Sequence, residues 1–160
     1  MIEGKVWKYG DNVNTDVIFP GKYTYTVTDP AEMASHAMED LDPEFAMNVK
    51  PGDIVVGGAN FGCGSSREQA AFCLKAAGVG AVIAKSFARL YFRNCINAGL
   101  PAFVQPELVD AVSAGDVIKV DISSGKIIAG SEYPFPEFPE EVKAILESGG
   151  LVEWVKSQAG

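Results

Sequence analysis

The sequence predicts a single α/β domain that spans residues 1–160 and contains a mixed β-sheet flanked by helices. In the middle of the chain, short apolar runs rich in β-branched residues alternate with segments of helical period, which favours parallel strands joined by helices. Near the C-terminal end, two such runs are separated by a short polar turn, which indicates a hairpin. The length of 160 residues, 48% of them hydrophobic and 21% charged, is typical of one compact domain.

The first forty residues are expected to hold one strand and one helix, separated by irregular segments. In chain order we expect a strand at 2–9, a turn-rich loop at 10–16, an extended piece at 17–20 and an exposed loop at 21–28. Thr28 or Asp29 is suited to cap a helix and Pro30 suits its first turn, so a helix is expected over 31–40. The loop at 21–28 has aromatic and hydroxyl side chains but no period, which predicts a mobile lid.

The middle of the chain predicts a strand, a loop, a helix and a second strand. A buried strand at 53–59 leads into a glycine-rich loop, after which a helix is expected to begin near Ser65 or Ser66 and to end at Gly78. The remaining elements are a strand at 80–86, a helix at 87–99, a strand at 101–105, a hairpin of 116–122 with 126–130, and a mostly helical tail at 139–158. Strands that alternate with helices and later pair locally predict the mixed sheet.

Charge and hydropathy exclude several classes of partner. The net charge is −8 and no basic run interrupts the chain, so nucleic acid and anionic membranes are not expected partners. The N-terminal segment lacks a long apolar core, and no apolar stretch approaches the roughly 18 residues that a membrane span needs. We therefore expect a cytoplasmic location.

Cysteine and histidine are too few and too scattered to build a metal site in this chain. Cys63, Cys73 and Cys95 form no C-x-x-C pair, and His36 is the single histidine. Cys73 and Cys95 stand in apolar helical settings and are expected in the core, and His36 is expected at the surface or its boundary. Cys63 lies in the glycine-rich loop, but no histidine is placed to activate it as a nucleophile.

The stretch 61-FGCGSSREQA-70 carries the features of an anion site. Glycines let the backbone approach a ligand, a helix N-terminus offers unpaired N–H donors, and the planar guanidinium of Arg67 suits a carboxylate. Neither a Walker A loop nor a dinucleotide fingerprint fits, because Cys63 and Arg67 occupy positions that those motifs reserve for lysine and glycine. The alternative is an ordinary helix start, in which Ser65 and Glu68 form a capping box without any function.

Three segments extend this observation to a family. The stretches 11-DNVNTDVIFP-20, 60-NFGCGSSREQA-70 and 82-VIAKSFARLYFRNCINAGL-100, in this order and spacing, resemble the small subunits of 3-isopropylmalate dehydratases, in the aconitase superfamily. The resemblance extends over nearly the whole chain. It implies an aconitase-type swivelling β/β/α domain that closes over the active site of a separate large subunit. That large subunit would carry the 4Fe–4S cluster, so this chain would hold no metal and would be active only with its partner.

The resemblance also implies roles for individual residues. Ser65 would be the general base that removes a proton from the carbon next to a carboxylate, and Arg67 with Ser66 would hold a carboxylate of a small dicarboxylate substrate. Asp16 would lie nearby and orient the arginine or the serine; the alternative for Asp16 is a simple turn-forming role. Arg89 and Arg93 belong to a family-like block but are left to packing or to the subunit interface.

Substrate choice is expected to depend on Thr24, Tyr25 and Thr26. Homoaconitase-like relatives place an arginine at the position of Tyr25, so an apolar or weakly polar substituent fits better here than a third carboxylate. The function expected from the resemblance is a hydro-lyase that converts 2-isopropylmalate to 3-isopropylmalate in leucine biosynthesis. The alternatives are a 2,3-dimethylmalate dehydratase or homoaconitase-like subunit and, from another class, a non-catalytic anion-binding regulatory domain.

Overall fold

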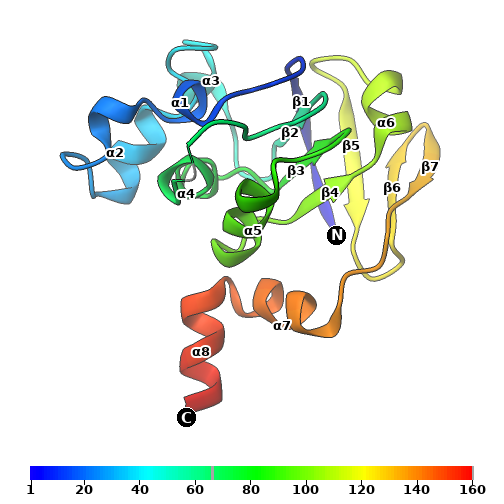
Figure 1. The fold of residues 1–160 in the computed structure, drawn as a ribbon. Helices are drawn as coiled ribbons and strands as arrows, with labels where there is room; N and C mark the ends of the chain where they lie inside the picture. The colour runs from blue at the N-terminus through cyan, green and yellow to red at the C-terminus, as the bar shows by residue number, and fades with distance from the viewer. Residues whose placement is uncertain (66, 160) are drawn as a thin grey trace.

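A computed structural model describes residues 1–65 and 67–159 and shows, within them, a mixed sheet of seven strands in the order β4-β3-β2-β1-β5-β6-β7 (Figure 1). Strands β4, β3, β2 and β1 are parallel, and β5, β6 and β7 follow β1 in antiparallel pairing. The strands are β1 (Ile2–Lys8), β2 (Ile54–Gly57), β3 (Ala81–Ala84), β4 (Ala102–Val104), β5 (Val117–Asp121), β6 (Lys126–Ala129) and β7 (Ser131–Pro134). The predicted α/β class and mixed sheet are confirmed.

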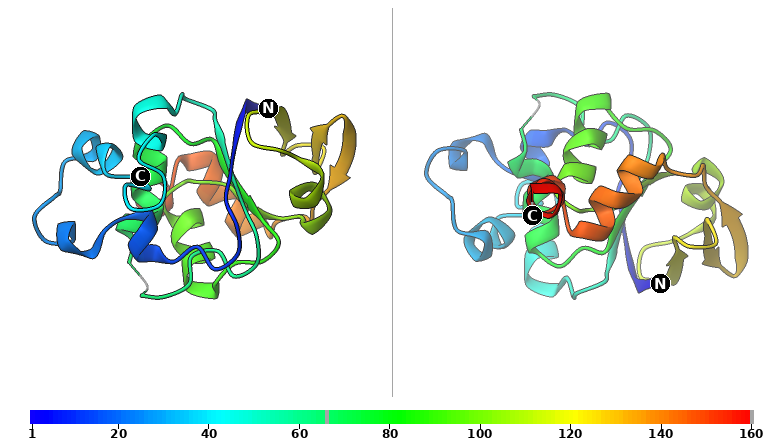
Figure 2. Two further views of the ribbon diagram at one scale, coloured as in Figure 1. Left: turned by 90° about the horizontal axis from the view of Figure 1, so that it is seen from above. Right: turned by 90° about the horizontal axis from the view of Figure 1, so that it is seen from below.

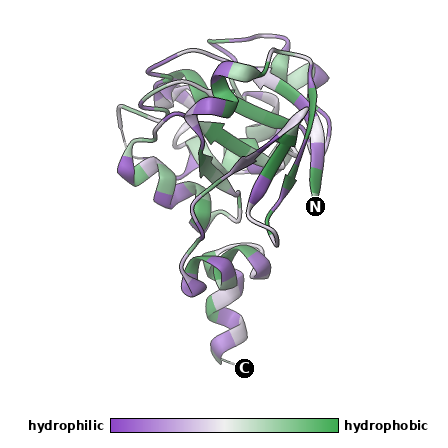
Figure 3. Ribbon diagram, turned by 90° about the vertical axis from the view of Figure 1, so that its right-hand side faces the viewer, coloured by the Kyte–Doolittle hydropathy of each residue, from purple (hydrophilic) through white to green (hydrophobic). Residues whose placement is uncertain are grey.

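Helices cover the parallel half of the sheet and extend the chain at its C-terminal end (Figures 1 and 2). They are α1 (Thr15–Ile18), the 3-10 turn η1 (Gly21–Tyr23), α2 (Pro30–Ser35), α3 (Phe45–Asn48), α4 (Gln69–Ala76), α5 (Arg89–Asn97), α6 (Pro106–Ala111), α7 (Glu140–Ser148) and α8 (Leu151–Ala159). Helix α8 projects from the body of the molecule (Figure 3), and it contains no buried residue.

Two hydrophobic clusters lie on the two faces of the parallel strands. All four residues of β2 are buried, as expected for a strand with both faces covered. Val55 and Val82 belong to the cluster formed with α1 to α5, whereas Ile54, Val56 and Ile83 belong to the cluster formed with α6, β5 and β6. The sheet curls, so that β5 to β7 turn away from the plane of the parallel strands (Figure 2). This is the β/β/α layering that the resemblance implies.

The N-terminal helices differ from the sequence expectation. The expected extended piece at 17–20 is wrong: Asn14 caps a one-turn helix, α1, by accepting a hydrogen bond from the Asp16 amide at 2.8 Å. Asp29 caps α2 and Pro30 is its first residue, as predicted, but α2 ends at Ser35 instead of continuing to residue 40. The Asp29 cap and Pro30 act on the first turn of α2, so they do not determine the residue at which the helix ends.

The other strands and helices follow the expected order, with additions. The hairpin of β5 and β6 and the helical tail are confirmed, although the tail divides into α7 and α8 at Gly149, which has a φ of +92°. Helices α3 and α6 and strand β7 were not expected, because each is short. The helix expected from Ser65 or Ser66 begins at Gln69 instead.

Candidate active site

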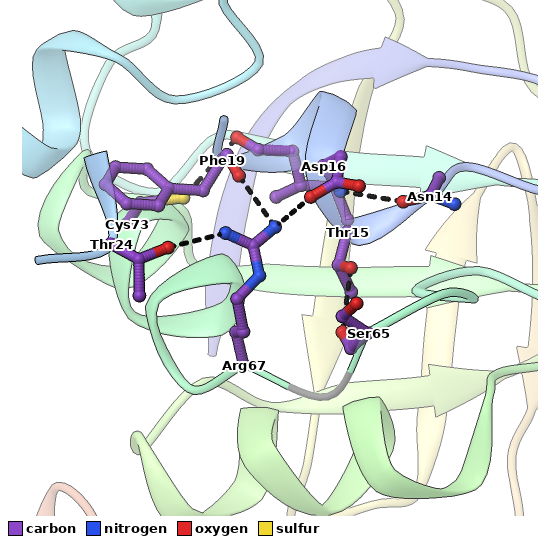
Figure 4. Close-up of polar contacts among 9 residues, drawn as sticks. Asn14, Thr15, Asp16, Phe19, Thr24, Ser65, Arg67 and Cys73 are labelled. Atoms are coloured by element: carbon purple, nitrogen blue, oxygen red, sulfur yellow. Dashed lines mark hydrogen bonds and ion pairs between the residues drawn. The ribbon is translucent and has the colours of Figure 1, made fainter. Parts of the chain in front are cut away.

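The candidate site lies where the loops after β1 and β2 meet, at the carboxyl ends of two parallel neighbouring strands (Figure 4). Asn14 and Cys63 form a parallel β-bridge between the two loops. The Gly62 amide donates to the Val13 carbonyl and the Thr15 amide donates to the Cys63 carbonyl, each at 2.8 Å. The two loops therefore form one rigid backbone unit although nearly fifty residues separate them along the chain.

Two glycines allow this close approach. Gly62 has a φ of +84°, and a Cβ atom added there would lie 2.1 Å from the ring of Tyr91. Gly64 has a φ of +94°, and an added Cβ atom would lie 2.7 Å from the side chain of Asn14. A larger residue at either position would strain the backbone and would clash with a packed side chain.

Ser65 is exposed, and its backbone is held by a buried threonine. The hydroxyl of Thr15 donates to the Ser65 carbonyl at 2.8 Å, and Thr15 is fully buried, with 0% of its surface exposed. The sequence analysis did not identify Thr15, because a threonine in a turn-rich loop gives no signal of burial. The hydrogen bond from Thr15 fixes the backbone of Ser65, while Ser65 itself is exposed.

Arg67 lies at the centre of the polar contacts in Figure 4. Its Nη2 atom lies 2.6 Å from Asp16 Oδ1 and donates to the Phe19 carbonyl at 3.0 Å, and its Nη1 atom donates to Thr24 Oγ1 at 3.0 Å. The Arg67 side chain is 14% exposed and that of Asp16 is 63% exposed. Three of the five N–H groups of a guanidinium are engaged by these contacts.

The predicted specificity residues take different positions around this arginine. Thr24 contacts Arg67, whereas Tyr25 is 94% exposed and Thr26 is exposed. The structure thus brings Ser65, Arg67, Asp16 and Thr24 to one place but does not bring Tyr25 and Thr26 into contact with them. Ser66 lies outside the described residues.

The capping-box interpretation of this loop is wrong. Helix α4 begins at Gln69, its N-cap residue is Glu68, and the cap makes no side-chain hydrogen bond to the backbone. The Arg67 carbonyl accepts from the Ala70 amide at 3.2 Å, so the loop leads into the helix through a turn. Ser65 and Arg67 therefore stand in the loop ahead of the helix, outside its first turn.

The cysteines divide as the sequence indicates. Cys73 and Cys95 are fully buried, and burial raises the pKa of both thiols, that of Cys95 to about 12. Cys63 is half-buried in the loop. Among residues 1–65 and 67–159, no group of three or more histidine, cysteine, aspartate or glutamate side chains is placed to hold a metal ion.

Ser65 and the side chain of Asp16 are exposed to solvent. A groove of about 480 Å³ lies between α4, α5 and the start of α8, and Glu68 and Gln69 contribute to its lining. Arg67, Asp16 and Thr24 do not line that groove.

In the part of the chain that the structure describes, no helix is long and apolar enough to cross a membrane.

Comparisons with known proteins assign this architecture to a family. The aconitase C-terminal domain family matches residues 8–107. The chain is 51% identical over 160 residues to the 3-isopropylmalate dehydratase small subunit of Thermodesulfovibrio yellowstonii, which covers 98% of this chain and 95% of that protein. It is 52% identical over 159 residues to the small subunit of the same name from Aquifex aeolicus, with 97% and 94% covered.

A solved structure has the same fold. The crystal structure of a 3-isopropylmalate dehydratase from Methanocaldococcus jannaschii is 42% identical to this chain and matches it with a TM-score of 0.92. The match covers 99% of this chain and 95% of the other. The likeness therefore extends over nearly the whole length of both chains.

Proposed function

The chain belongs to the family of 3-isopropylmalate dehydratase small subunits, and on that premise we propose that it is the small subunit of a hydro-lyase that converts 2-isopropylmalate to 3-isopropylmalate. The observation that carries the proposal is the near-complete alignment, 98% of this chain at 51% identity to a small subunit of that name. The gathering of Ser65, Arg67 and Asp16 at the carboxyl ends of β1 and β2 supports it, because the reaction needs a base next to a carboxylate site.

Ser65 is proposed as the general base. Its exposed position lets its hydroxyl reach a substrate, and the hydrogen bond from Thr15 to its carbonyl keeps the loop in place during the proton transfer. A serine hydroxyl is a weak base unless its alkoxide is stabilised, and the cation of Arg67 in the same loop supplies stabilisation. Ser65 would take the proton from the carbon next to a substrate carboxylate and return it when water adds again.

Arg67, together with Ser66, is proposed to bind that carboxylate. The contacts to Asp16, Phe19 and Thr24 hold the guanidinium plane in one orientation. They engage both N–H groups of Nη2, so the Nε–H group and the second N–H group of Nη1 are left to donate to a substrate carboxylate. Asp16 would act on the substrate only through Arg67, as the residue that orients it.

The proposed partner is a large subunit that carries a 4Fe–4S cluster. The described residues of this chain offer no group of ligands for such a cluster. When bound in the partner, the cluster would supply a Lewis acid for the substrate hydroxyl. The contribution of this chain would be the base, the carboxylate site and the exclusion of water on closure, and a cytoplasmic location stays a prediction.

The loop with Thr24, Tyr25 and Thr26 is proposed to face the variable group of the substrate. Tyr25 is 94% exposed and is therefore available to a substrate held between the subunits. Without an arginine at this position, a third carboxylate would lose its ion partner in the closed site, which costs several kcal/mol. This favours isopropylmalate over a homoaconitate-type substrate.

The proposal is tested with Ser65→Ala in the complex with the large subunit. Loss of a general base lowers the rate by about 10²- to 10⁴-fold, while the exposed position of Ser65 predicts unchanged folding and subunit association. Turnover of 2-isopropylmalate would be measured anaerobically, with circular dichroism and size-exclusion chromatography as checks of folding and assembly. Ser123→Ala, in the exposed turn between β5 and β6, is the matched control. A Ser65→Ala complex with a near-normal rate would exclude Ser65 as the base.

A further inference from the structure

Three side chains form a cluster beside the loop at 21–28. The ring of Tyr23 stacks on the imidazole of His36, with ring centroids 3.9 Å apart and planes inclined by 21°. The Tyr23 hydroxyl donates to Glu39 Oε2 at 3.1 Å, and His36 Nδ1 lies 2.9 Å from Glu39 Oε1. We call these three residues the aromatic clasp.

The clasp is attached to the hydrophobic core. His36 follows the last residue of α2, and Met33 of that helix is buried in the cluster formed with α4. Between His36 and Glu39 stand Ala37 and Met38, both fully buried, and the Met38 amide donates to the Ile18 carbonyl at 2.7 Å. His36 and Glu39 are therefore held from the core side, while Tyr23 belongs to the loop that contacts them.

The clasp is one residue away from the candidate site. Thr24 follows Tyr23, and its hydroxyl accepts from Arg67 Nη1 at 3.0 Å. A contact that fixes Tyr23 consequently fixes the place of Thr24 against the guanidinium. The residues that follow, Tyr25 and Thr26, are exposed, whereas Val27 is buried in the core and marks the far end of this stretch. The ring of Tyr23 also lies 6.0 Å from that of Phe19, so the hydroxyl contact with Glu39 adds to a packed position of the ring.

We propose that Tyr23 is a positioning residue for the reaction, and that the aromatic clasp holds the loop at 21–28 in the arrangement that binds substrate. The inference rests on the proposed function. Tyr23 touches no substrate in this account; it acts through Thr24 and Arg67. The hydrogen bond with His36 lowers the pKa of the Glu39 carboxyl, and the carboxylate is the acceptor for the Tyr23 hydroxyl. The ammonium of Lys22 lies 5.1 Å from the centre of the Tyr23 ring and is the other charged group that faces the clasp.

The expected kinetic signature is a rise in KM with little change in kcat. A loop that occupies its binding arrangement for a smaller fraction of the time weakens apparent affinity by that fraction. Once substrate is bound the arrangement is restored, so the proton transfer by Ser65 proceeds as before. Loss of one hydrogen bond to a partly exposed acceptor predicts a rise in KM of about two- to tenfold for Tyr23→Phe.

The experiment is a double-mutant cycle on the complex with the large subunit, with 2-isopropylmalate as substrate. Tyr23→Phe keeps the ring stack and removes the hydroxyl; Glu39→Ala removes the acceptor. We expect both variants to raise KM with kcat within about twofold, and Glu39→Ala to raise it at least as much as Tyr23→Phe, because it also removes the contact with His36. The double variant should raise KM no further than Glu39→Ala, because the Tyr23–Glu39 hydrogen bond is already lost there. Tyr9→Phe is the control, since the Tyr9 hydroxyl donates to Asp42 Oδ2 at 2.9 Å outside this loop.

The outcomes separate this inference from the function it rests on. An inactive wild-type complex would overturn the proposed function and the inference with it. An active wild type whose KM is unchanged in both Tyr23→Phe and Glu39→Ala would overturn the inference alone. Independent, multiplying effects of the two substitutions, or an equal rise in Tyr9→Phe, would also overturn it. Thermal unfolding of each variant confirms that the complexes compared are folded.

Discussion

At the scale of single residues, the ion pair of Arg67 and Asp16 orients the guanidinium but contributes little to the stability of the protein. The two side chains approach to 2.6 Å, but Asp16 is 63% exposed, and ion pairs with one solvated partner contribute little to the free energy of unfolding. The Arg67 side chain is only 14% exposed, and it is also held by a backbone carbonyl and by Thr24. The contacts therefore determine where the planar cation points, which is what carboxylate recognition requires.

Arg67→Lys is expected to weaken substrate binding while leaving the fold intact. Lysine keeps the charge but replaces a planar fork by a point charge, so the fixed direction of the donors and the contacts that orient them are lost. We expect KM to rise by about tenfold or more, in line with the loss of a charge-assisted hydrogen bond, with a smaller effect on kcat. Steady-state kinetics of the complex measure both. Lys119→Arg, an exchange of one cation for another at an exposed position of β5, serves as control, and a wild-type KM in Arg67→Lys would contradict the assignment.

At the scale of elements, the parallel pairing of β1 and β2 creates the site. Two strands that pair in parallel end at the same edge, so the loops that follow them meet there. The bridge between Asn14 and Cys63 continues that pairing beyond the strands. Helix α5 supports the second loop from below, since Tyr91 is buried under Gly62 and its hydroxyl donates to the Ala70 carbonyl at 3.0 Å.

Gly62→Ala is expected to destabilise the protein far more than a comparable glycine substitution. Gly62 has a φ of +84° and its added methyl group would lie 2.1 Å from the Tyr91 ring, so both backbone strain and overpacking act. We expect a loss of about 3 kcal/mol or more in the free energy of unfolding. Gly115 has a φ of +92° with nothing within 4 Å, so Gly115→Ala carries the strain alone. Its expected loss is about 1–2 kcal/mol. Urea unfolding compares the two, and equal losses would refute the role of the Tyr91 contact.

At the scale of the whole molecule, the proposal is that the chain supplies one side of an active site. The net charge is −8, so attraction of an anionic substrate depends on the local cation of Arg67 and not on the overall field. Ser65 and the side chain of Asp16 are exposed, and Arg67 and Asp16 do not line the groove beside α4. Such an arrangement suits a domain that closes against a partner, because exclusion of water then comes from the second surface.

The isolated chain is expected to be colourless and inactive. Its described residues offer no group of metal ligands, so purified protein should contain no iron and should show no visible absorbance. Mixing with the large subunit under anaerobic conditions should restore interconversion of the isopropylmalates. Metal analysis and an absorbance assay of the alkene intermediate measure this. Stoichiometric iron and sulfide in the isolated chain, together with turnover, would contradict the division of labour between the subunits.

The sequence by itself determined the alternation of strands and helices in the middle of the chain, the later hairpin and the glycine-rich loop that follows a buried strand. Those features have local causes: buried strands such as 53–59 are continuous apolar runs, and the stretch 61-FGCGSSREQA-70 concentrates glycine, hydroxyl and cation in ten residues. The buried state of Cys73 and Cys95 and the Asp29 cap of α2 were also predictable from near neighbours.

Only the tertiary structure decided which residues meet. Asp16 and Arg67 are separated by 51 positions, Thr15 and Ser65 by 50, and no local pattern records either contact. The start of α4 at Gln69 and the burial of Thr15 likewise depend on how the loop after β1 packs on the loop after β2. In the sequence, Tyr23 is one of two tyrosines in an irregular loop. Its stacking on His36 depends on the end of α2 at Ser35, which places His36 beside the Tyr23 ring. A contact between distant segments costs the entropy of loop closure and gains the free energy of burying surface. Neither contribution can be inferred from a stretch of neighbouring residues.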